Sequence, residues 1–304
     1  MSLRPGPETV AVHRAGTVAI VGRPNVGKST LLNRLVGCKV SITSSRPQTT
    51  RQRITGIVTR ADAQIVFVDT PGYQTEHDNA LNRAMNRSVA ASLQEVDTVV
   101  WMVEAMKYDE RDERVSKLLA LQTPVILAIN KTDAMKEKPR LLPFIAGLSA
   151  RRRFEAIIPV SAAKGSQVGE LLDAIVRLLP EGPALHDADE LTTVNERILA
   201  AELLREKLFQ QLGDELPYAA TVEIERFRLD GGLRRIEASI LVDKEGHKPI
   251  VIGKQGAKLK SIATRARRDM EQLFGGKVFL EVWVKVRRGW AESEATLKRM
   301  GYGE

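Results

Sequence analysis

The chain has 304 residues, of which 43% are apolar and 28% charged, and its formal net charge is +8. This length and composition predict two globular domains of ordinary size, and the basic balance suggests a polyanionic partner without identifying one. The single cysteine, Cys38, excludes an intrachain disulfide and is typical of a reducing compartment. The sequence has no signal-peptide pattern at its start and no apolar run near the ~20 residues that span a bilayer, so we expect a cytosolic or membrane-surface protein.

Strand and helix patterns alternate through the first half of the chain. The alternation predicts an α/β domain, with a doubly wound, mostly parallel sheet and helices on both faces. We expect strands at 17–22, 97–105, 124–130 and 156–162, a strand pair within 53–70 that turns at 61–63, and helices at 28–37, 82–96, 112–122 and 168–180.

A break in this rhythm follows at residues 180–193, which hold two prolines, a glycine and an acidic cluster. We interpret this stretch as the region of a domain boundary, near residue 185. The predicted division is a flexible N-terminal extension at 1–15, a first domain at 16–183, a linker at 184–193 and a second domain at 194–304.

The second domain has a different order of elements. A long amphipathic helix opens it and ends at Gly213, and a turn at Gly231–Gly232 joins two strands into a hairpin. The order α-β-β-α-α-β predicts an α+β domain. We expect the helix at 194–213, strands at 218–229, 233–244 and 277–288, a short apolar turn at 249–252, the loop GKQG at 253–256 and a helix at 257–274.

Residues 22–29 read GRPNVGKS and match Gly-x-x-x-x-Gly-Lys-[Ser/Thr] between a predicted strand and a predicted helix. Glycines let backbone N–H groups point at phosphate oxygens, and the helix N-terminus adds its positive dipole end. Lys28 can reach the β- and γ-phosphates, and Ser29 can offer a hydroxyl to Mg²⁺. The candidate phosphate-binding residues are Gly22, Arg23, Pro24, Asn25, Val26, Gly27, Lys28, Ser29 and Thr30.

A second motif, DTPG, follows an apolar strand about forty residues after Lys28. The carboxylate of Asp69 can hold Mg²⁺ directly or through water, and Gly72 can offer its backbone N–H to the γ-phosphate. The candidate nucleotide-binding residues here are Asp69, Thr70, Pro71 and Gly72.

The base is predicted by NKTD, which ends the strand at 124–130. Asp133 can accept two hydrogen bonds from the N1–H and 2-amino groups of guanine, and adenine does not offer this pair. Lys131 can lie along the base plane, and Asn130 can tie this loop to residues 22–29. The segment Ser161, Ala162, Ala163 follows the next strand and can present a backbone N–H to the guanine oxygen. All these motifs stand at carboxyl ends of strands, where an open α/β sheet binds ligands.

The polar segment 41–56, which contains Pro47, is interpreted as a mobile loop. Thr50 is the candidate for a second Mg²⁺ hydroxyl that orders the loop in the presence of the γ-phosphate, with Thr49 as the neighbouring alternative and an ordinary polar loop as the simpler one. Among the residues named so far, we expect Lys28, Thr50 and Gly72 to be catalytic, and Ser29, Thr50 and Asp69 to be the metal ligands.

Tyr73 follows DTPG, where many GTPases carry a glutamine that orients the attacking water. Gln74 is one position late, so we expect slow intrinsic hydrolysis or water placed by other means. Asn25 resembles the asparagine of GTPases that use K⁺ in place of an arginine finger, and K⁺ is therefore a hypothesis for a further cofactor.

The most basic stretch surrounds GKQG. Residues 244–299 contain 14 Lys and Arg against 6 Asp and Glu, and the difference of +8 equals the net charge of the whole chain. The loop and its place in the α-β-β-α-α-β order resemble a type II KH domain, in which two glycines let the loop clamp about four single-stranded nucleotides. A helix-capping turn is the simpler alternative. The resemblance implies a base groove floored by Ile250, Val251, Ile252 and Ile262, and RNA-binding residues Ile252, Gly253, Lys254, Gln255, Gly256, Lys258 and Lys260.

From about residue 17 to the C-terminus, GRPNVGKS, PQTTR, DTPG, NKTD, SAA and VIGKQGAKLKSIATRAR together resemble the Era family, bacterial Ras-like GTPases of the TrmE-Era-EngA type with a KH domain. The resemblance implies GTP hydrolysis with Mg²⁺, binding to the 3′ end of 16S rRNA, and a role in maturation of the 30S subunit. It also implies a cytoplasmic monomer that associates peripherally with the inner membrane and has no DNA partner.

Two alternatives remain at this stage. The first is a passive RNA-binding factor whose nucleotide domain only supports folding, although nothing structural needs Lys28, Ser29 and Asp133 together. The second is a regulatory GTPase at the membrane surface whose basic segment meets anionic lipid or another RNA, although attraction to lipid does not need a glycine clamp.

Overall fold

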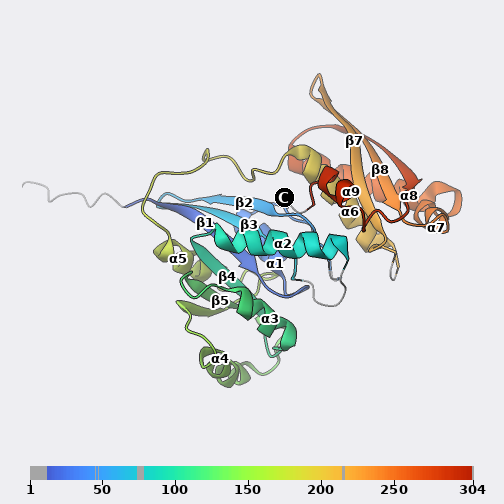
Figure 1. The fold of residues 1–304 in the computed structure, drawn as a ribbon. Helices are drawn as coiled ribbons and strands as arrows, with labels where there is room; N and C mark the ends of the chain where they lie inside the picture. Colours follow the sequence, from blue (N-terminus) through green and yellow to red (C-terminus); the bar gives the residue numbers. More distant parts are fainter. Residues whose placement is uncertain (1–11, 45, 47, 74–78, 214–215, 303–304) are drawn as a thin grey trace, which may run out of the picture.

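The computed structural model describes residues 12–44, 46, 48–73, 79–213 and 216–302. They form two sheets with their helices, one from each half of the chain (Figure 1). We call the first the N-terminal domain and the second the C-terminal domain. Within the described ranges, no helix combines the length and apolar character that crossing a membrane requires.

The N-terminal domain is built on a six-stranded sheet in the order β2-β3-β1-β4-β5-β6. Neighbouring strands run parallel except β2, which pairs antiparallel with β3 at one edge. The predicted mostly parallel sheet is therefore confirmed. The strands are β1 (Arg14–Val21), β2 (Ile54–Thr59), β3 (Ala63–Asp69), β4 (Thr98–Glu104), β5 (Val125–Asn130) and β6 (Ala156–Pro159).

Helices cover both faces of this sheet. Along β1, Val18 and Ile20 enter the core formed with α1 and α5, whereas Ala19 and Val21 enter the core formed with α2, α3 and α4. This alternation follows from the two-residue period of a strand and confirms the doubly wound arrangement. The helices are α1 (Lys28–Val36), α2 (Ala80–Gln94), α3 (Glu110–Leu118), α4 (Leu141–Ser149) and α5 (Val168–Leu178), with short 3₁₀ turns η1 (Thr132–Ala134) and η2 (Lys138–Arg140).

The C-terminal domain has a three-stranded sheet in which β7 and β8 form an antiparallel hairpin and β9 pairs parallel with β8. The apolar face of this sheet packs against α6 and α8 in one core. The elements are α6 (Glu196–Gln211), β7 (Ala220–Asp230), β8 (Leu233–Val242), α7 (His247–Ile252), η3 (Lys254–Gly256), α8 (Ala257–Phe274), β9 (Val278–Val286) and α9 (Glu294–Arg299).

Several predicted boundaries were wrong. Strand β1 begins at Arg14, whose backbone N–H donates to the Asp62 carbonyl at 3.1 Å, so the predicted extension 1–15 runs too far. Helix α3 ends at Leu118 because Leu119 turns to extended geometry and buries its side chain. The predicted apolar turn at 249–252 is the end of helix α7.

Helices α4 and α9 were not predicted. The sequence of α4, LLPFIAGLS, has a proline near its start and no clear apolar stripe, so helical periodicity gave no signal there. Proline is tolerated in a first turn because the first N–H groups of a helix have no intrahelical partner. Helix α9 has six residues, too few for a periodic pattern.

The predicted amphipathic helix is confirmed as a helix, but four of its charged residues do not meet solvent. Glu202, Arg205, Glu206 and Lys207 of α6 are buried together with its leucines, because α6 lies between the two domains. On the N-terminal side it faces the segment around residues 39–51, which makes several of the polar contacts of α6. The C-terminus returns to the same boundary, where Trp290 and Leu297 pack with Leu81 and Met85 of α2.

Candidate functional site

The loop between β1 and α1 has the backbone that a phosphate cradle needs. Gly22, Asn25 and Gly27 all have positive φ, and a Cβ at Gly27 would lie 2.3 Å from Nδ2 of Asn130. A Cβ at Gly22 would lie 2.5 Å from the carbonyl oxygen of Met102, so neither glycine tolerates a side chain in this arrangement. The loop follows a strand and opens a helix, which is the context that the sequence motif requires.

Lys28 is buried at 6% exposure and its ammonium points back into the loop. Its Nζ donates to the carbonyl oxygens of Gly22 at 3.0 Å and Arg23 at 3.1 Å. Burial lowers the pKa of Lys28 to about 8, while the nearby charge of Asp69 acts in the opposite direction. A phosphate in this loop would meet a cation that is already stripped of water.

Three predicted metal-ligand side chains meet at one point. The Ser29 hydroxyl donates to Oδ2 of Asp69 at 2.7 Å and lies 2.8 Å from the hydroxyl of Thr50. Thr49, the alternative to Thr50, points elsewhere and donates to the carbonyl of Arg46. Burial raises the pKa of Asp69, and hydrogen bonds from hydroxyl groups oppose that shift.

Two observations show that this group suits a hard cation. Oδ1 of Asp69 is buried and has no hydrogen-bond partner among the described residues. The donor set, a carboxylate with two hydroxyls, is of the oxygen type that Mg²⁺ prefers. Sequence reasoning missed Ser41, whose hydroxyl donates to Oδ2 of Asp69 at 2.8 Å.

The residues after DT in DTPG bring the chain against the phosphate loop. Thr70 donates through its hydroxyl to the carbonyl of Ile20, and a Cβ at Gly72 would lie 2.9 Å from the Cα of Pro24. Only glycine permits this approach, which places its backbone beside the phosphate loop. Tyr73 packs against the apolar core under α2 and α3 rather than standing over the loop. Gln74 and Pro47 lie outside the described residues.

Asn130 joins three loops, as its sequence position predicted for two of them. Its Nδ2 donates to the carbonyl of Val26 at 2.8 Å, and its Oδ1 accepts from the N–H of Ala162 at 2.9 Å. Asp133 is held from the same side, because Ser161 donates to its Oδ1 at 2.6 Å. Ala163 accepts from Arg34 of α1 through its carbonyl. The loops after β1, β5 and β6 therefore form one rim.

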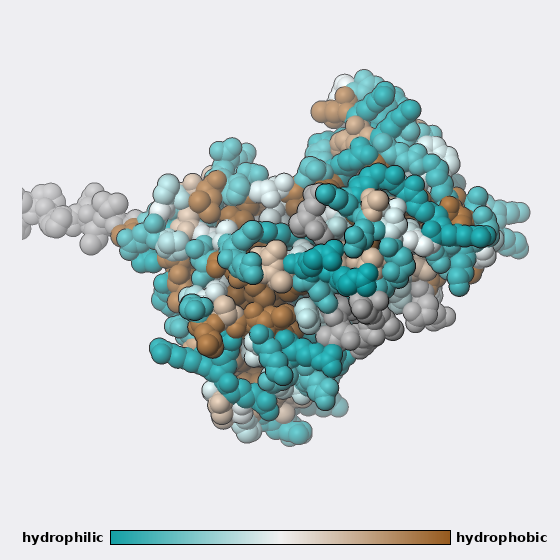
Figure 2. Space-filling view, viewed as in Figure 1, coloured by the Kyte–Doolittle hydropathy of each residue, from teal (hydrophilic) through white to brown (hydrophobic). Residues whose placement is uncertain are grey.

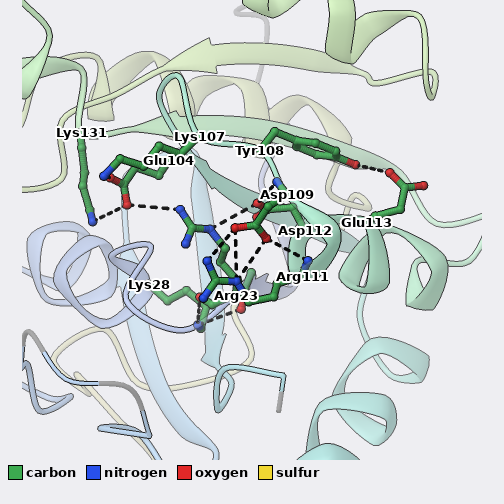
Figure 3. A network of polar contacts seen from close by, with 11 residues as sticks. Arg23, Lys28, Glu104, Lys107, Tyr108, Asp109, Arg111, Asp112, Glu113 and Lys131 are labelled. Atoms are coloured by element: carbon green, nitrogen blue, oxygen red, sulfur yellow. Dashed lines mark hydrogen bonds and ion pairs between the residues drawn. The ribbon is translucent and has the colours of Figure 1, made fainter. Parts of the chain in front are cut away.

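Lys131 and Arg23 are linked by a carboxylate that the sequence analysis did not single out (Figure 3). Glu104, at the end of β4, accepts from Lys131 at 2.7 Å and from Arg23 at 3.4 Å. Arg23 also forms an ion pair at 3.3 Å with Asp112, a buried residue of α3. Burial raises the pKa of Asp112 to about 6. This network holds the phosphate loop and the NKTD loop at a fixed spacing.

A cavity of about 290 Å³ opens over these groups. Its walls come from the phosphate loop, from residues 42–44 and 48–50, from Gly72 and from Lys131. Thr132 and Asp133 line a neighbouring cavity, also bordered by Pro159 and Ser166. Thus Lys28, Ser29, Thr50, Gly72 and Lys131 line one cavity, and Asp133 lines a second.

The GKQG loop joins α7 to α8 at the far end of the C-terminal domain. Gly253 has φ 72° and ψ 178°, and a Cβ there would lie 2.6 Å from the Cβ of Lys258, so the backbone requires glycine. Gly256 has φ 78° and is the N-cap residue of α8. Lys254 and Lys260 are exposed and Lys258 is half-buried, and within the described part of the chain none of the three has an ion-pair partner.

The expected apolar floor of the groove needs correction. Val251 and Ile262 are fully buried in the core of the C-terminal domain, so they support the loop from beneath and offer no surface to a base. Ile250 is 49% exposed, and Ile252 is partly buried against the same core. These two remain available as contact surface.

The sequence analysis also missed a polar seam between the domains. Arg205 of α6 donates to the Thr49 carbonyl and to Glu202, and Glu206 accepts from the N–H of Thr43 at 3.0 Å. Arg51 is fully buried and donates to the carbonyls of Ala220 and Pro217. Charges of both signs one turn apart on α6 are the signal that could have suggested such a network.

Arg51 also stacks on two rings of the C-terminal domain. Its guanidinium carbon lies 5.6 Å from the ring centroid of Phe209 and 5.4 Å from that of Trp290. Burial, with Arg205 nearby, lowers the pKa of Arg51 to about 10. The residues on both sides of Thr50 are therefore anchored in the C-terminal half.

Both domains are similar to known proteins. A family model described as a 50S ribosome-binding GTPase matches residues 17–131, and a KH domain model matches residues 215–291. GTPase Era of Xanthomonas oryzae pv. oryzae is 53% identical over 295 residues, covering 97% of this chain and 99% of that protein.

Solved structures agree over the same length. A crystal structure of an Aquifex aeolicus Era variant bound to GDP and AlF₄⁻ matches with a TM-score of 0.92 at 39% identity, covering 96% of this chain and 100% of that chain. A crystal structure of Era in complex with MgGDPNP and nucleotides 1506–1542 of 16S ribosomal RNA matches with a TM-score of 0.92 at 38% identity and the same coverage. Since the similarity spans both domains and nearly every residue, the chain belongs to the Era family and is a GTPase.

Proposed function

We propose that this protein is a GTP-hydrolysing switch whose KH domain binds the 3′ end of 16S rRNA and assists assembly of the 30S ribosomal subunit. One observation carries the proposal: the segment beside the phosphate loop is bonded to α6 of the domain that presents GKQG. The Era structure that contains a segment of 16S rRNA supports this choice of RNA.

In this proposal the residues at 22–30 bind the phosphates, with Lys28 as the cation for the β- and γ-oxygens. Asp133 accepts from the guanine N1–H and 2-amino groups, and Ser161 fixes the direction of its carboxylate. The N–H of Ala162 is already bonded to Asn130, which leaves the neighbouring backbone of Ala163 for the guanine oxygen.

A magnesium ion would be held by Ser29 and Thr50, with Asp69 adjoining them directly or through water. Bound there, it would neutralise charge on the β- and γ-phosphates. The Ser29 hydroxyl bonds to Thr50 and donates to Asp69, so a metal would replace hydrogen bonds that the site already forms. For hydrolysis, Lys28, Thr50 and the backbone of Gly72 surround the place of the γ-phosphate.

Potassium is a further cofactor in the proposal, held near Asn25. Asn25 has a left-handed backbone and lines the cavity of about 290 Å³ beside the phosphate loop. Turnover in K⁺ and Na⁺ buffers, for wild type and Asn25→Ala, tests this role. We expect faster turnover in K⁺ for wild type only, and equal rates in all four conditions would remove potassium from the mechanism.

The switch works through the chain around Thr50. Its neighbours Thr49 and Arg51 are hydrogen-bonded to α6 and to the start of β7. A movement of Thr50 toward a γ-phosphate would therefore change the geometry of these hydrogen bonds. RNA bound to the KH domain would act on the same contacts in reverse, and linkage requires the two effects to be equal in size.

The clamp is the GKQG loop. Gly253 and Gly256 permit close approach of a sugar–phosphate backbone. The ammonium groups of Lys254, Lys258 and Lys260, which have no ion-pair partner among the described residues, meet phosphates. We also infer a monomer in the cytoplasm, without a DNA partner and with peripheral contact at the inner membrane. The family resemblance alone supports these last points.

The test measures affinity for an RNA from the 3′ end of 16S rRNA, in GTP-analogue and GDP states. Lys254 and Gln255 are exposed, and Gln255 has the left-handed backbone that Asp adopts readily, so the double variant Lys254→Asp/Gln255→Asp should fold normally. We expect it to lose RNA affinity by at least about tenfold while GTP binding is unchanged.

Gly253→Asp is the stronger variant, since its side chain would strike Lys258. Equal RNA binding by wild type and both variants would exclude the loop as the clamp. Equal RNA affinity of the wild type in both nucleotide states would exclude the coupling. In cells depleted of the protein, the double variant should fail to restore mature 30S subunits, and full restoration would separate the clamp from assembly.

A further inference from the structure

Helix α8 carries a second basic surface on the side away from the core. Ile262, Ala266 and Met270 recur at helical spacing and are fully buried. The opposite side of the helix lines a shallow hollow of about 310 Å³, formed by Ala257, Lys260, Ser261, Thr264, Arg265 and Arg268. We call these six residues the α8 stripe.

The cations of the stripe are free of acidic partners. Within the described ranges, Lys260, Arg265 and Arg268 form no ion pair. The two acids of α8 are engaged elsewhere: Asp269 pairs with Lys39 and Lys207 toward α6, and Glu271 pairs with Arg267 at 2.8 Å. A helix face with three cations, two hydroxyls and no acid is therefore left to attract an anion.

The stripe is continuous with the GKQG loop. Ala257 is the first residue of α8 and follows Gly256 directly, and Arg268 lies eleven residues further on, which is roughly 17 Å along a helix. A KH loop clamps about four nucleotides, so a longer RNA must leave the clamp over neighbouring protein surface. Figure 2 shows mostly hydrophilic side chains over the end of the C-terminal domain where Figure 1 places α7 and α8.

We propose that the α8 stripe binds the sugar–phosphate backbone of the RNA that adjoins the clamped nucleotides, independently of base sequence. The inference deepens the proposed RNA binding and rests on it. The stripe offers ammonium, guanidinium and hydroxyl donors but no aromatic ring on which a base could stack, so its contacts are with phosphate and ribose.

An anionic membrane is the other polyanion that such a surface could meet. A helix that binds a bilayer surface inserts apolar side chains below its cations. The apolar side chains of α8 are buried in the core of the KH domain, so the helix has none to insert. The charge pattern therefore favours RNA.

The experiment compares three RNA probes on the full-length protein. One is about six nucleotides from the 3′ end of 16S rRNA, close to the length of the clamp. The others carry the same nucleotides with ten uridines added at either end. The variant is Arg265→Gln/Arg268→Gln, and the control is Arg114→Gln/Lys117→Gln, which removes two exposed cations from α3 of the N-terminal domain.

We expect the stripe variant to bind the short probe as the wild type does, and to bind one extended probe about five- to tenfold more weakly. Its slope of log affinity against log salt should fall by about 0.7 for each lost phosphate contact. The control variant should match the wild type with every probe.

Three results would overturn the inference: unchanged binding of both extended probes by the stripe variant, equal weakening of the short and extended probes, or loss of binding to phosphatidylglycerol vesicles with RNA binding intact. Failure of the proposed function would give a different result. In that case Lys254→Asp/Gln255→Asp would bind the short probe as tightly as the wild type does. Matching thermal melting curves of the variants confirm that they are folded.

Discussion

Lys28 and Lys254 are both proposed to meet phosphate, but their surroundings are opposite. Lys28 is buried at 6% exposure and donates to two backbone carbonyls, and its pKa is lowered to about 8. Lys254 is exposed and has no ion-pair partner in the described part of the chain. The lysine of the nucleotide site is therefore desolvated before any ligand binds, whereas the lysine of the KH loop is hydrated.

This difference teaches what each site can select. A buried site discriminates by leaving wrong ligands with unpaired polar groups, and it is screened little by salt. An exposed basic loop draws on counterion release, which gives affinity for any nucleic-acid backbone and a strong dependence on salt.

The largest effect is expected from Asp133→Asn. An amide cannot accept both guanine hydrogen bonds, so GTP affinity should fall by roughly a thousandfold or more. Xanthosine triphosphate, which has a carbonyl in place of the 2-amino group, should gain affinity. Titration with fluorescent nucleotides measures both. Ser161→Ala is the milder comparison, since it removes only the bond that orients Asp133 and should cost about 1 kcal/mol. Wild-type GTP affinity in Asp133→Asn would contradict the assignment of the base site.

Salt should separate the two regions next. With three or four phosphate contacts on a single strand, RNA affinity should fall roughly 20- to 50-fold between about 50 and 200 mM salt. GTP affinity should change far less over the same range, because its contacts are buried. Binding isotherms at four salt concentrations measure both slopes. Parallel slopes for GTP and RNA would break the contrast.

The seam at α6 should carry a smaller effect. Replacing Glu202→Gln together with Arg205→Met removes the bond to the Thr49 carbonyl without leaving a buried carboxylate unpaired. If RNA affinity differs about tenfold between GTP-analogue and GDP states, as allosteric couplings commonly do, the ratio should approach one in this variant. Arg226→Gln/Glu237→Gln, an exposed pair on the KH sheet, is the matched control. An unchanged ratio in the seam variant would move the coupling elsewhere.

The smallest expected effect is on pH. Phosphate oxygens favour the ammonium form, so GTP binding should raise the pKa of Lys28 above its value of about 8 in the free protein. Affinity should therefore be constant below about pH 8 and fall as the pH rises through that value, with uptake of a proton.

Calorimetry in two buffers of different ionisation enthalpy measures that uptake. The heats should differ between the buffers near pH 9 and agree near pH 7, where Lys28 is charged before GTP arrives. Equal heats at both pH values would show that Lys28 keeps its proton throughout.

The sequence predicted the nucleotide site better than the seam between the domains, for a physical reason. Each nucleotide motif is a local pattern at the end of a strand, and one sheet brings all those ends together. Asn130 illustrates this, since its position after β5 already implied contact with the loop after β1. Ser41 and Glu104 were missed because their partners come from distant strands.

The seam depends on which surface α6 meets, and a single helix pattern does not contain that information. Charged residues on α6 predicted an exposed face, yet Glu206 is fully buried, and Lys39 and Thr43 of the N-terminal domain are among its partners. For Val251 and Ile262 the error was the opposite one, because they were predicted on a surface and are buried. Their apolar side chains suit a groove floor or a core equally well, and they pack in the core with α6 and the sheet.

The connection between the domains leaves little slack. The N–H groups of Leu185 and His186 donate to Gln64, Leu191 accepts from the N–H of Ile57 at 2.9 Å, and Thr192 donates to the carbonyl of Thr55 at 2.6 Å. Helix α6 is capped by Asn195 only three residues later. The connection is thus hydrogen-bonded along β2 almost as far as the KH domain.

Thr193 also donates its N–H to the Thr55 hydroxyl at 3.1 Å, so the bonds to β2 continue to within two residues of the α6 cap. This attachment limits how far the two domains could separate. A wider excursion would unzip the connection from β2 and expose the bare edge of the six-stranded sheet, where another strand could add. The same few hydrogen bonds therefore limit the separation of the two domains and keep the edge strand β2 covered.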